Sequence, residues 1–285
     1  MVDLPVDCRG ARPLLLGLQD CALCAYGFDC CGTPMVVKVG KHEVELYDTI
    51  EKLPIVRFHR YQKMMLLDAG LGGDLAAFDS KLERARHYIL SGDKDNASKE
   101  LENLRLSVYF IQNGITPRHR AFAALVRRVD GREFAEIGDA ETDEILALLS
   151  DAPADEMDGG LSDVKKKITD EISLYFPALF NDGVEKEYYD LLKRRTEKLL
   201  DGIIQGVEDP EADAEDLTIK VLLYVKPKLY TGSEGLDVQY DKRFETLCLI
   251  LGEQLGIDAK TKTVAEFYNA FEYLQSRAKK QKARK

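Results

Sequence analysis

Two runs of apolar residues with helical spacing constrain the fold more than any other feature of this sequence. Within each run the intervals alternate between three and four residues, which places one apolar stripe along a helix. The members are Leu75, Phe78, Leu82, Ala85 and Ile89, then Ala97, Leu101, Leu104, Val108 and Ile111. Because Ser91-Gly92-Asp93 separates the runs, we expect an antiparallel helical hairpin.

Residues at the ends of these helices also indicate where each helix begins or stops. Asp74 is a plausible N-cap of the first helix, and Asn113-Gly114 a plausible stop for the second. Thr116-Pro117 predicts the start of a third helix, which carries Phe122, Leu125 and Val129 and ends at Asp130-Gly131. Before the helices, alternating residues at 36–47 around Gly40-Lys41 predict a β-hairpin.

The second half of the chain is also predicted to be helical. Ser162 is the expected cap of a helix that buries Val164, Ile168, Ile172 and Phe176, and a further helix is expected over 184–205. The segment 217–226 fits a strand or a helix. Two helices close the chain, and the second opens with a capping box, Thr263 to Glu266.

The predicted fold class is mainly α, with helical bundle domains and a small N-terminal β-hairpin. Two segments have the composition of acidic linkers: 138–160 contains eight acids and no base, and 208–216 contains six acids in nine residues. The predicted division is an extension at 1–34, a hairpin plus three-helix domain at 35–132, an acidic linker at 133–160, a helical hairpin at 161–207, an acidic linker at 208–216, and a helical domain with a basic tail at 217–285.

The first 34 residues differ from the rest, since they hold five of the six cysteines and no Lys, Glu or His. Three interpretations stay open. One is a mis-called start, with the protein beginning at Met35; another is a flexible, disordered tail. The third is a zinc or iron–sulfur site, because thiolates with this spacing can chelate one metal. Its ligands would come from Cys21, Cys24, Cys30 and Cys31.

Charge and hydropathy exclude several classes of partner. The net charge of −10 argues against broad binding to a nucleic-acid backbone, which needs many cations to neutralise phosphates. No apolar run approaches the ~20 residues of a membrane-spanning helix, and the N-terminus lacks the pattern of a secretory signal. We therefore expect a cytoplasmic protein that binds no membrane.

No constellation of residues predicts catalysis. The glycine-rich run 70–74 lacks the Lys and Ser/Thr of a phosphate-binding loop and is interpreted as a turn. Asp79, Glu83 and His87 share one helix face but are interleaved with cations, which favours a solvated face over a metal site. Cys248 lies on an apolar face and is expected to be buried. We predict no enzyme activity and no cofactor.

Aromatic residues and a basic tail are the remaining signals. Some aromatics exceed what one helical stripe can bury and are candidate protein-binding residues, because such rings anchor interfaces; core packing is the alternative. They are Tyr188, Tyr189, Phe267, Tyr268, Phe271 and Tyr273. The tail 277–285 carries six cations in nine residues. It fits a helix end whose cations suit the helix dipole, or a contact with an acidic partner.

Two segments resemble phage tail assembly chaperones. Residues 35–46, MVVKVGKHEVEL, are similar to the short hairpin that opens some of these proteins, and 263–274, TVAEFYNAFEYL, to helical segments near their C-termini. The resemblance implies a non-enzymatic chaperone that coats a long helical tail protein, in the host cytoplasm. It carries over no functional residues.

Our leading hypothesis is therefore a non-enzymatic, protein-binding assembly factor or scaffold that could also self-associate. Two alternatives remain: a nucleic-acid-associated adaptor that uses the basic tail, and a metal-binding protein that uses the N-terminal cysteines.

Overall fold

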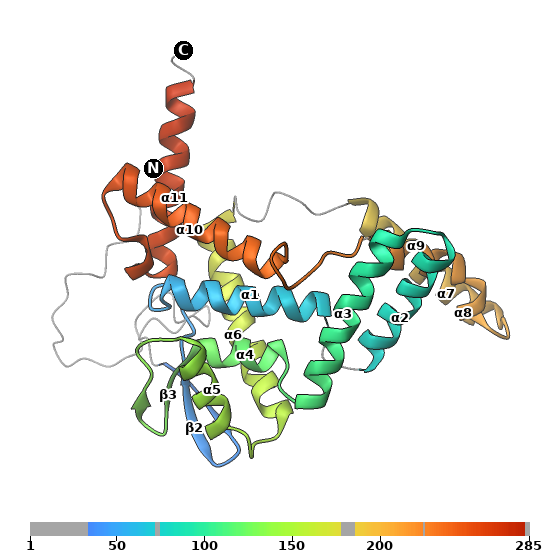
Figure 1. The fold of residues 1–285 in the computed structure, drawn as a ribbon, viewed down its shortest axis with the longest axis horizontal. Helices are drawn as coiled ribbons and strands as arrows, with labels where there is room; N and C mark the ends of the chain where they lie inside the picture. Colours follow the sequence, from blue (N-terminus) through green and yellow to red (C-terminus); the bar gives the residue numbers. More distant parts are fainter. Residues whose placement is uncertain (1–33, 72–74, 178–185, 225, 283–285) are drawn as a thin grey trace, which may run out of the picture. The chain divides into compact units, whose positions relative to one another are not determined.

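The computed structural model describes residues 34–71, 75–177, 186–224 and 226–282. It confirms the predicted fold class, being 71% helical with 11 helices and a small four-stranded antiparallel sheet over these residues (Figure 1). The strands are β1 (Met35–Val39), β2 (His42–Leu46), β3 (Val126–Val129) and β4 (Arg132–Glu133). The α-helices are α1 (Ile55–Leu71), α2 (Leu75–Leu90), α3 (Lys94–Asn113), α4 (Pro117–Leu125), α5 (Asp139–Leu148), α6 (Ala154–Tyr175), α7 (Lys186–Gln205), α8 (Pro210–Asp213), α9 (Glu215–Tyr224), α10 (Leu236–Leu255) and α11 (Val264–Lys282), and η4 (Ala259–Thr261) is a short 3-10 helix before α11.

The sheet contains the predicted hairpin and two strands that were not predicted. β1 and β2 pair from Met35↔Leu46 to Val39↔His42, and Gly40 takes a positive φ of 59° in the two-residue loop. The expectation that the third helix runs to Val129 is wrong. α4 ends at Leu125, and Val126–Val129 pairs with β2 as strand β3. Positive φ at both Asp130 and Gly131 makes the tight turn that returns the chain as β4.

Helix α4 is the centre of the hydrophobic core. Every residue from Ala121 to Leu125 is fully buried, and the helix packs against α1, α5 and α6. Its small alanines let these helices approach closely. Gly160 of α6 serves the same purpose, because a Cβ there would lie 3.3 Å from Phe122 and 3.4 Å from Val37.

The segment predicted as an acidic linker, 133–160, contains helix α5 and the first turns of helix α6. α6 begins at Ala154 rather than at the predicted Ser162 cap. Ile145, Leu149 and Met157 belong to the central hydrophobic core. The acids mark the solvent side of these helices. The two glycines of α6 do not end the helix, and Gly160 is the one at a close contact.

The second predicted linker, 208–216, is also partly helical. Asp209 accepts a hydrogen bond from the Ala212 amide at 3.0 Å and caps the short helix α8. Lys198 of α7 lies 3.6 Å from Asp213 and 3.7 Å from Asp216, so the acidic segment folds back along α7. The ambiguous segment after it is helix α9.

The two ends of the described chain meet in one core. Pro54 and Thr263 form an isolated β-bridge, and the amide of Val264 donates to the Leu53 carbonyl at 2.9 Å. Leu251 and Phe267, near the C-terminus, share a hydrophobic cluster with the strands and α4. Residues 35–285 form one compact unit, and the N-terminal extension lies outside the described residues. The predicted division of the chain into separate domains stays a prediction.

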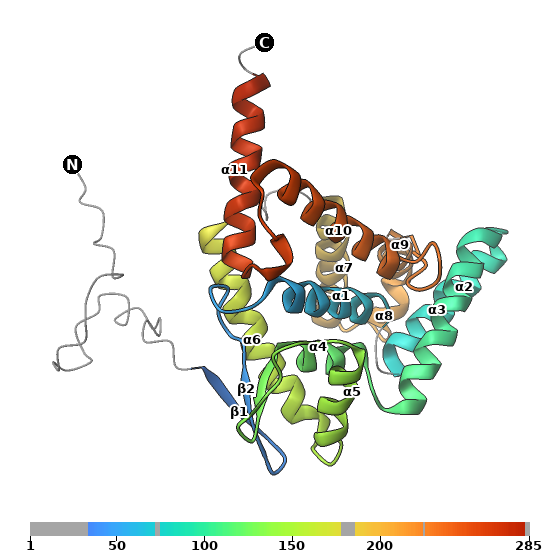
Figure 2. The ribbon, with the colours of Figure 1, turned by 60° about the vertical axis from the view of Figure 1, so that its left-hand side comes forward.

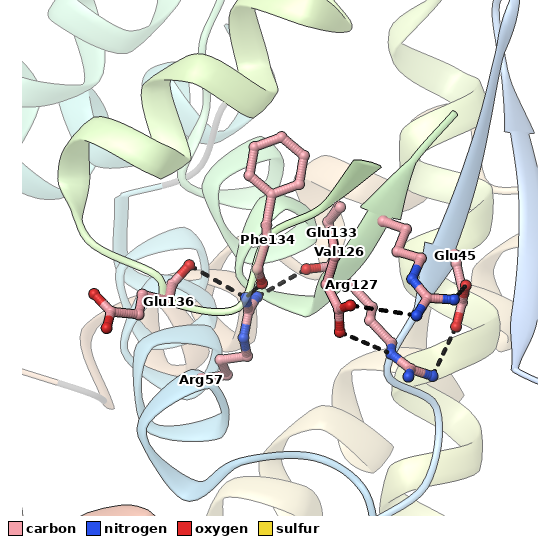
Figure 3. Close-up of polar contacts among 8 residues, drawn as sticks. Glu45, Arg57, Val126, Arg127, Glu133, Phe134 and Glu136 are labelled. Carbon is pink, nitrogen blue, oxygen red and sulfur yellow. Dashed lines mark hydrogen bonds and ion pairs between the residues drawn. The ribbon is translucent and has the colours of Figure 1, made fainter. Parts of the chain in front are cut away.

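Arg57 of α1 ties this core to the sheet. Its side chain is 1% exposed, and it donates to the carbonyls of Ala124 and Val126 at 3.2 and 2.8 Å. It also donates to the carbonyls of Phe134 and Glu136 (Figure 3). These carbonyls belong to the last turn of α4, to β3 and to the segment after β4, where the chain passes from helix to sheet and leaves it again. The guanidinium supplies a donor to each of them.

Replacing Arg57 with methionine should lower the free energy of unfolding by about 3 kcal/mol, because several buried carbonyls lose their donor while the apolar volume is kept. Chemical denaturation of the full chain measures this change. Arg86→Met is the matched control, since that side chain is 68% exposed and should change stability by no more than ~0.5 kcal/mol. Equal stability of the two variants would contradict the role assigned to Arg57.

Candidate protein-binding surface

Helices α2 and α3 form the antiparallel hairpin that the sequence predicts (Figure 2). Gly92 turns the chain with φ 78°, and Asp93 caps α3 by accepting from the Asn96 amide at 3.2 Å. Gly114 ends α3 in the left-handed conformation. The predicted cap Asp74 lies outside the described residues, as do Gly72 and Gly73. Ala85, Ala97 and Leu104 are buried.

Much of the apolar stripe on each helix faces solvent. Leu75, Leu82 and Ile89 of α2 are 69%, 46% and 58% exposed, and Leu101 of α3 is 50% exposed. Val108, one heptad after Leu101, is half-buried. Residues seven apart lie one above another on a helix, so these side chains form two adjacent rows.

The buried side of the same hairpin holds charged and polar groups beside Ala85, Ala97 and Leu104. Glu100 is fully buried, and it forms an ion pair with Arg84 of the facing helix. Burial raises the pKa of Glu100, although Arg84 and Lys81 act in the opposite direction. Lys81 itself is 4% exposed and donates to the carbonyl of Leu71.

Hydrogen bonds from α3 complete this polar attachment. Ser107 donates to the Leu71 carbonyl at 2.9 Å, and Asn103 donates to the Lys228 carbonyl, also at 2.9 Å. Polar groups that are buried in this way need partners, and the partners here are backbone carbonyls and opposite charges. The hairpin is therefore held by its polar side and presents its apolar side outward.

A polar cavity of about 320 Å³ lies beside α1 and α10, and it is the second candidate site. His59 stacks between Tyr240 and Phe244, with ring centroids 4.6 and 4.1 Å away. Asp241 lies 2.9 Å from His59 Nε2 and 2.5 Å from Lys63 Nζ. Burial lowers the pKa of His59 more than Asp241 raises it. Burial pushes the pKa of Asp241 upward, but the hydrogen bonds from Lys63 and His59 outweigh it and leave that pKa low.

The remaining charges of this cavity are also paired. Arg60 contacts Asp139 at 2.7 Å, and Lys260 contacts Glu245 at 2.8 Å. The cations are thus already neutralised by acids within the chain, and the cavity lining contains no Ser, Thr or Cys that the histidine could activate. The arrangement supports packing between α1 and α10 better than it supports chemistry on a ligand.

The predicted aromatic residues are spread between core and surface. Phe267 is 4% exposed and stacks on Phe244 with centroids 6.0 Å apart, so its ring is not open to a partner. Tyr268 is half-buried and contacts the ring of Phe176 at 5.4 Å. Tyr273 is 57% exposed. Phe271 is half-buried, and Tyr188 and Tyr189 lie in α7 with side chains outside the description.

The other predicted features are placed as follows. Cys21, Cys24, Cys30 and Cys31 lie outside the described residues. Within the described ranges, no three His, Cys, Asp or Glu side chains are grouped as metal ligands. Cys248 is buried at 9% exposure, as expected. The basic tail continues α11, with exposed cations from Arg277 to Lys280. Roles for the tail and for the cysteines stay predictions.

None of the protein-family models, curated proteins or solved structures compared with the chain matches it. The resemblance to phage tail assembly chaperones therefore stays a prediction. Among the helices of the described residues, none is both long and apolar enough to cross a membrane.

The apolar residues of α2 and α3 were identified in the sequence, but which of them face solvent was not predicted. One signal pointed to their exposure: polar and charged residues such as Arg84, Glu100 and Asn103 occupy the neighbouring helical face. Spacing alone cannot decide which face a hairpin turns toward the rest of the chain.

The buried His59 predicts a pH dependence of stability. Its pKa is lower in the folded than in the unfolded chain, so the unfolded state takes up a proton first as pH falls through ~6.5, and stability drops. His59→Gln should therefore flatten the loss of stability between about pH 7.5 and about pH 5.5. Urea denaturation of both proteins across this range measures the difference. If both proteins lost the same stability over this pH range, the role assigned to His59 would be contradicted.

Proposed function

We propose that this protein is a non-enzymatic, protein-binding assembly factor that receives an amphipathic helix of another protein on the outer face of its α2–α3 hairpin. The observation that carries the proposal is the orientation of the hairpin, which buries charged groups and exposes rows of large aliphatic side chains. Exposed apolar patches of this kind are typical of interaction sites.

The geometry of the face favours a helix as the occupant. Leu75, Leu82 and Ile89 recur every seven residues on α2, and Leu101 and Val108 repeat that interval on α3. Two adjacent helices with heptad-spaced rows present an apolar face on which a third helix can pack its side chains. α2 has 16 residues, which corresponds to a length of about 24 Å, so a partner segment of about four turns would cover it.

Charges around the face support selectivity for an amphipathic partner. Ion pairs flank the rows on each helix, with Arg86 and Glu83 on α2 and Arg105 and Glu102 on α3. Both signs are present, so a polar rim of mixed charge surrounds an apolar centre, as in typical protein interfaces. Each aliphatic side chain that becomes fully covered contributes about 1.5–3 kcal/mol before the costs of association.

The chain's resemblance to phage tail assembly chaperones suggests which partner this would be. In that interpretation the bound helix belongs to a long helical tail protein, and binding takes place in the host cytoplasm. The proposed surface is consistent with a chaperone that covers apolar helices before they assemble.

A pair of charge substitutions on the hairpin tests the proposal. Leu82→Glu/Ile89→Glu should abolish recovery of the helical partner when the tagged full chain is purified from its native source, because two charges would enter the apolar face. Binding of the partner's helical segment should then weaken at least tenfold in a fluorescence anisotropy titration. Both replaced residues are about half exposed, so the melting temperature should stay unchanged.

The matched control is Leu174→Glu/Leu249→Glu, at positions 61% and 65% exposed on α6 and α10. This variant should retain the partner. Equal loss in both variants, or retention in both, would overturn the surface assignment. A substrate-dependent turnover that a point substitution abolishes would overturn the non-enzymatic proposal.

A further inference from the structure

A cavity of about 620 Å³ lies where helix α3 ends and helices α4, α5 and α6 come together (Figure 2). A volume of this size is typical of sites for small molecules. The lining contains none of the exposed aliphatic residues of the hairpin face, such as Leu82 and Ile89. The cavity is therefore separate from the proposed protein-binding surface, and what it binds does not depend on that proposal.

Apolar side chains from three elements line the cavity. Ile115 lies in the turn between α3 and α4 and is 38% exposed, whereas Leu146 of α5 and Met157 of α6 are largely buried. The small side chains of Ala147 and Ala154 lie along the same lining. These residues offer an apolar surface against which a hydrocarbon group can be removed from water.

His119 of α4 is a buried polar side chain of this lining, at 8% exposure. Its Nδ1 atom accepts from the Thr116 amide at 3.2 Å, and its own amide donates to Thr116 Oγ1 at 3.3 Å. This capping box fixes the tautomer, because a neutral imidazole that accepts at Nδ1 carries its proton on Nε2. Nε2 makes no hydrogen bond with any residue that the structure describes. Buried donors normally have a partner, so this N–H is available to an acceptor inside the cavity.

Arg120, the next residue, brings a positive charge to the same cavity. Its Nη2 atom donates to Asp143 at 2.9 Å, and within the described ranges the guanidinium makes no other hydrogen bond. The Asp143 side chain is 60% exposed, so water screens its charge and it compensates the cation only in part. The remaining N–H groups of Arg120 can therefore bind one more anion, and a carboxylate matches their planar arrangement.

We propose that this cavity binds a small apolar carboxylic acid. The carboxylate accepts from Nε2–H of His119 and from the guanidinium of Arg120, and the hydrocarbon part lies against Ile115, Leu146 and Met157. A carboxylate fits better than a phosphate dianion, because the cavity supplies one cation and shares it with Asp143. It fits better than a neutral group, because hydrogen bonds to a charged acceptor are the stronger ones.

Isothermal titration calorimetry of the full chain tests the site, with octanoate as the probe. Octanoate should bind saturably at one site per chain. Octanamide, which has the same hydrocarbon chain and no charge, should bind about tenfold more weakly, since it loses a charge-assisted hydrogen bond. The absence of saturable binding at millimolar octanoate, or equal binding of octanamide, would overturn the proposal.

Two substitutions test the assigned donors. His119→Glu keeps an acceptor for the Thr116 amide, since glutamate is preferred at this position of a capping box, but it replaces the Nε2 donor with an anion. Arg120→Met removes the guanidinium and leaves Asp143 exposed to water. Each variant should bind octanoate about tenfold more weakly than the wild type.

The matched control is Arg105→Met, at an α3 position that is 84% exposed and outside the cavity lining. This variant should bind octanoate like the wild type. If His119→Glu does not fold, as judged by circular dichroism, Arg120→Met alone decides the question. Wild-type affinity in Arg120→Met, or an equal loss in Arg105→Met, would show that octanoate does not bind through these donors.

Discussion

The guanidinium of Arg57 joins the helical and sheet parts of the core. Four backbone carbonyls converge on it, from the end of α4, from β3 and from the segment after β4. When a chain leaves a buried helix and immediately forms a strand, backbone amides cannot satisfy all of its carbonyls. A buried cation with several fixed donors resolves this problem, and it lets α4 pass without a loop into the sheet.

In the α2–α3 hairpin, charged groups are buried and large aliphatic side chains are exposed. Its buried side uses Arg84, Glu100 and the carbonyl of Leu71, while its aliphatic rows stay in contact with water. An ion pair in a buried position adds little net stability, because desolvation offsets much of the attraction. Which way the hairpin faces is fixed by contacts outside it, from Lys81 and Ser107 to the Leu71 carbonyl and from Asn103 to the Lys228 carbonyl. The orientation of the apolar rows therefore depends on polar contacts that are specific rather than strongly stabilising.

The sequence predicted most of the helices and the first β-hairpin, because these depend on local spacing and on caps such as Gly114, Thr116 and Thr263. It did not predict helix α1, and it placed the start of α6 at Ser162 rather than at Ala154. It did not predict strand β3, since Val126–Val129 acquires its partner from β2, some 80 residues earlier along the chain. It also did not predict that Ile145 and Leu149 would be buried within an acid-rich segment. For the candidate site, the apolar residues were identified but their exposure was not. Which face of a helix meets solvent depends on tertiary contacts such as Asn103 with Lys228, which no local pattern encodes.

The hydrogen bonds between 50–55 and 262–265 also bear on how the protein is made. The amides of Val264 and Ala265 bond to carbonyls of Leu53 and Ile50, and Ile55 bonds back to Lys262. These contacts close a loop that spans most of the chain, and such long-range closure slows folding relative to bundles with local contacts. During synthesis, the residues around Leu53 are made some 210 residues before these partners. Until residues 262–265 emerge, the chain carries an incomplete core, and its apolar segments are open to chaperones and to misfolding.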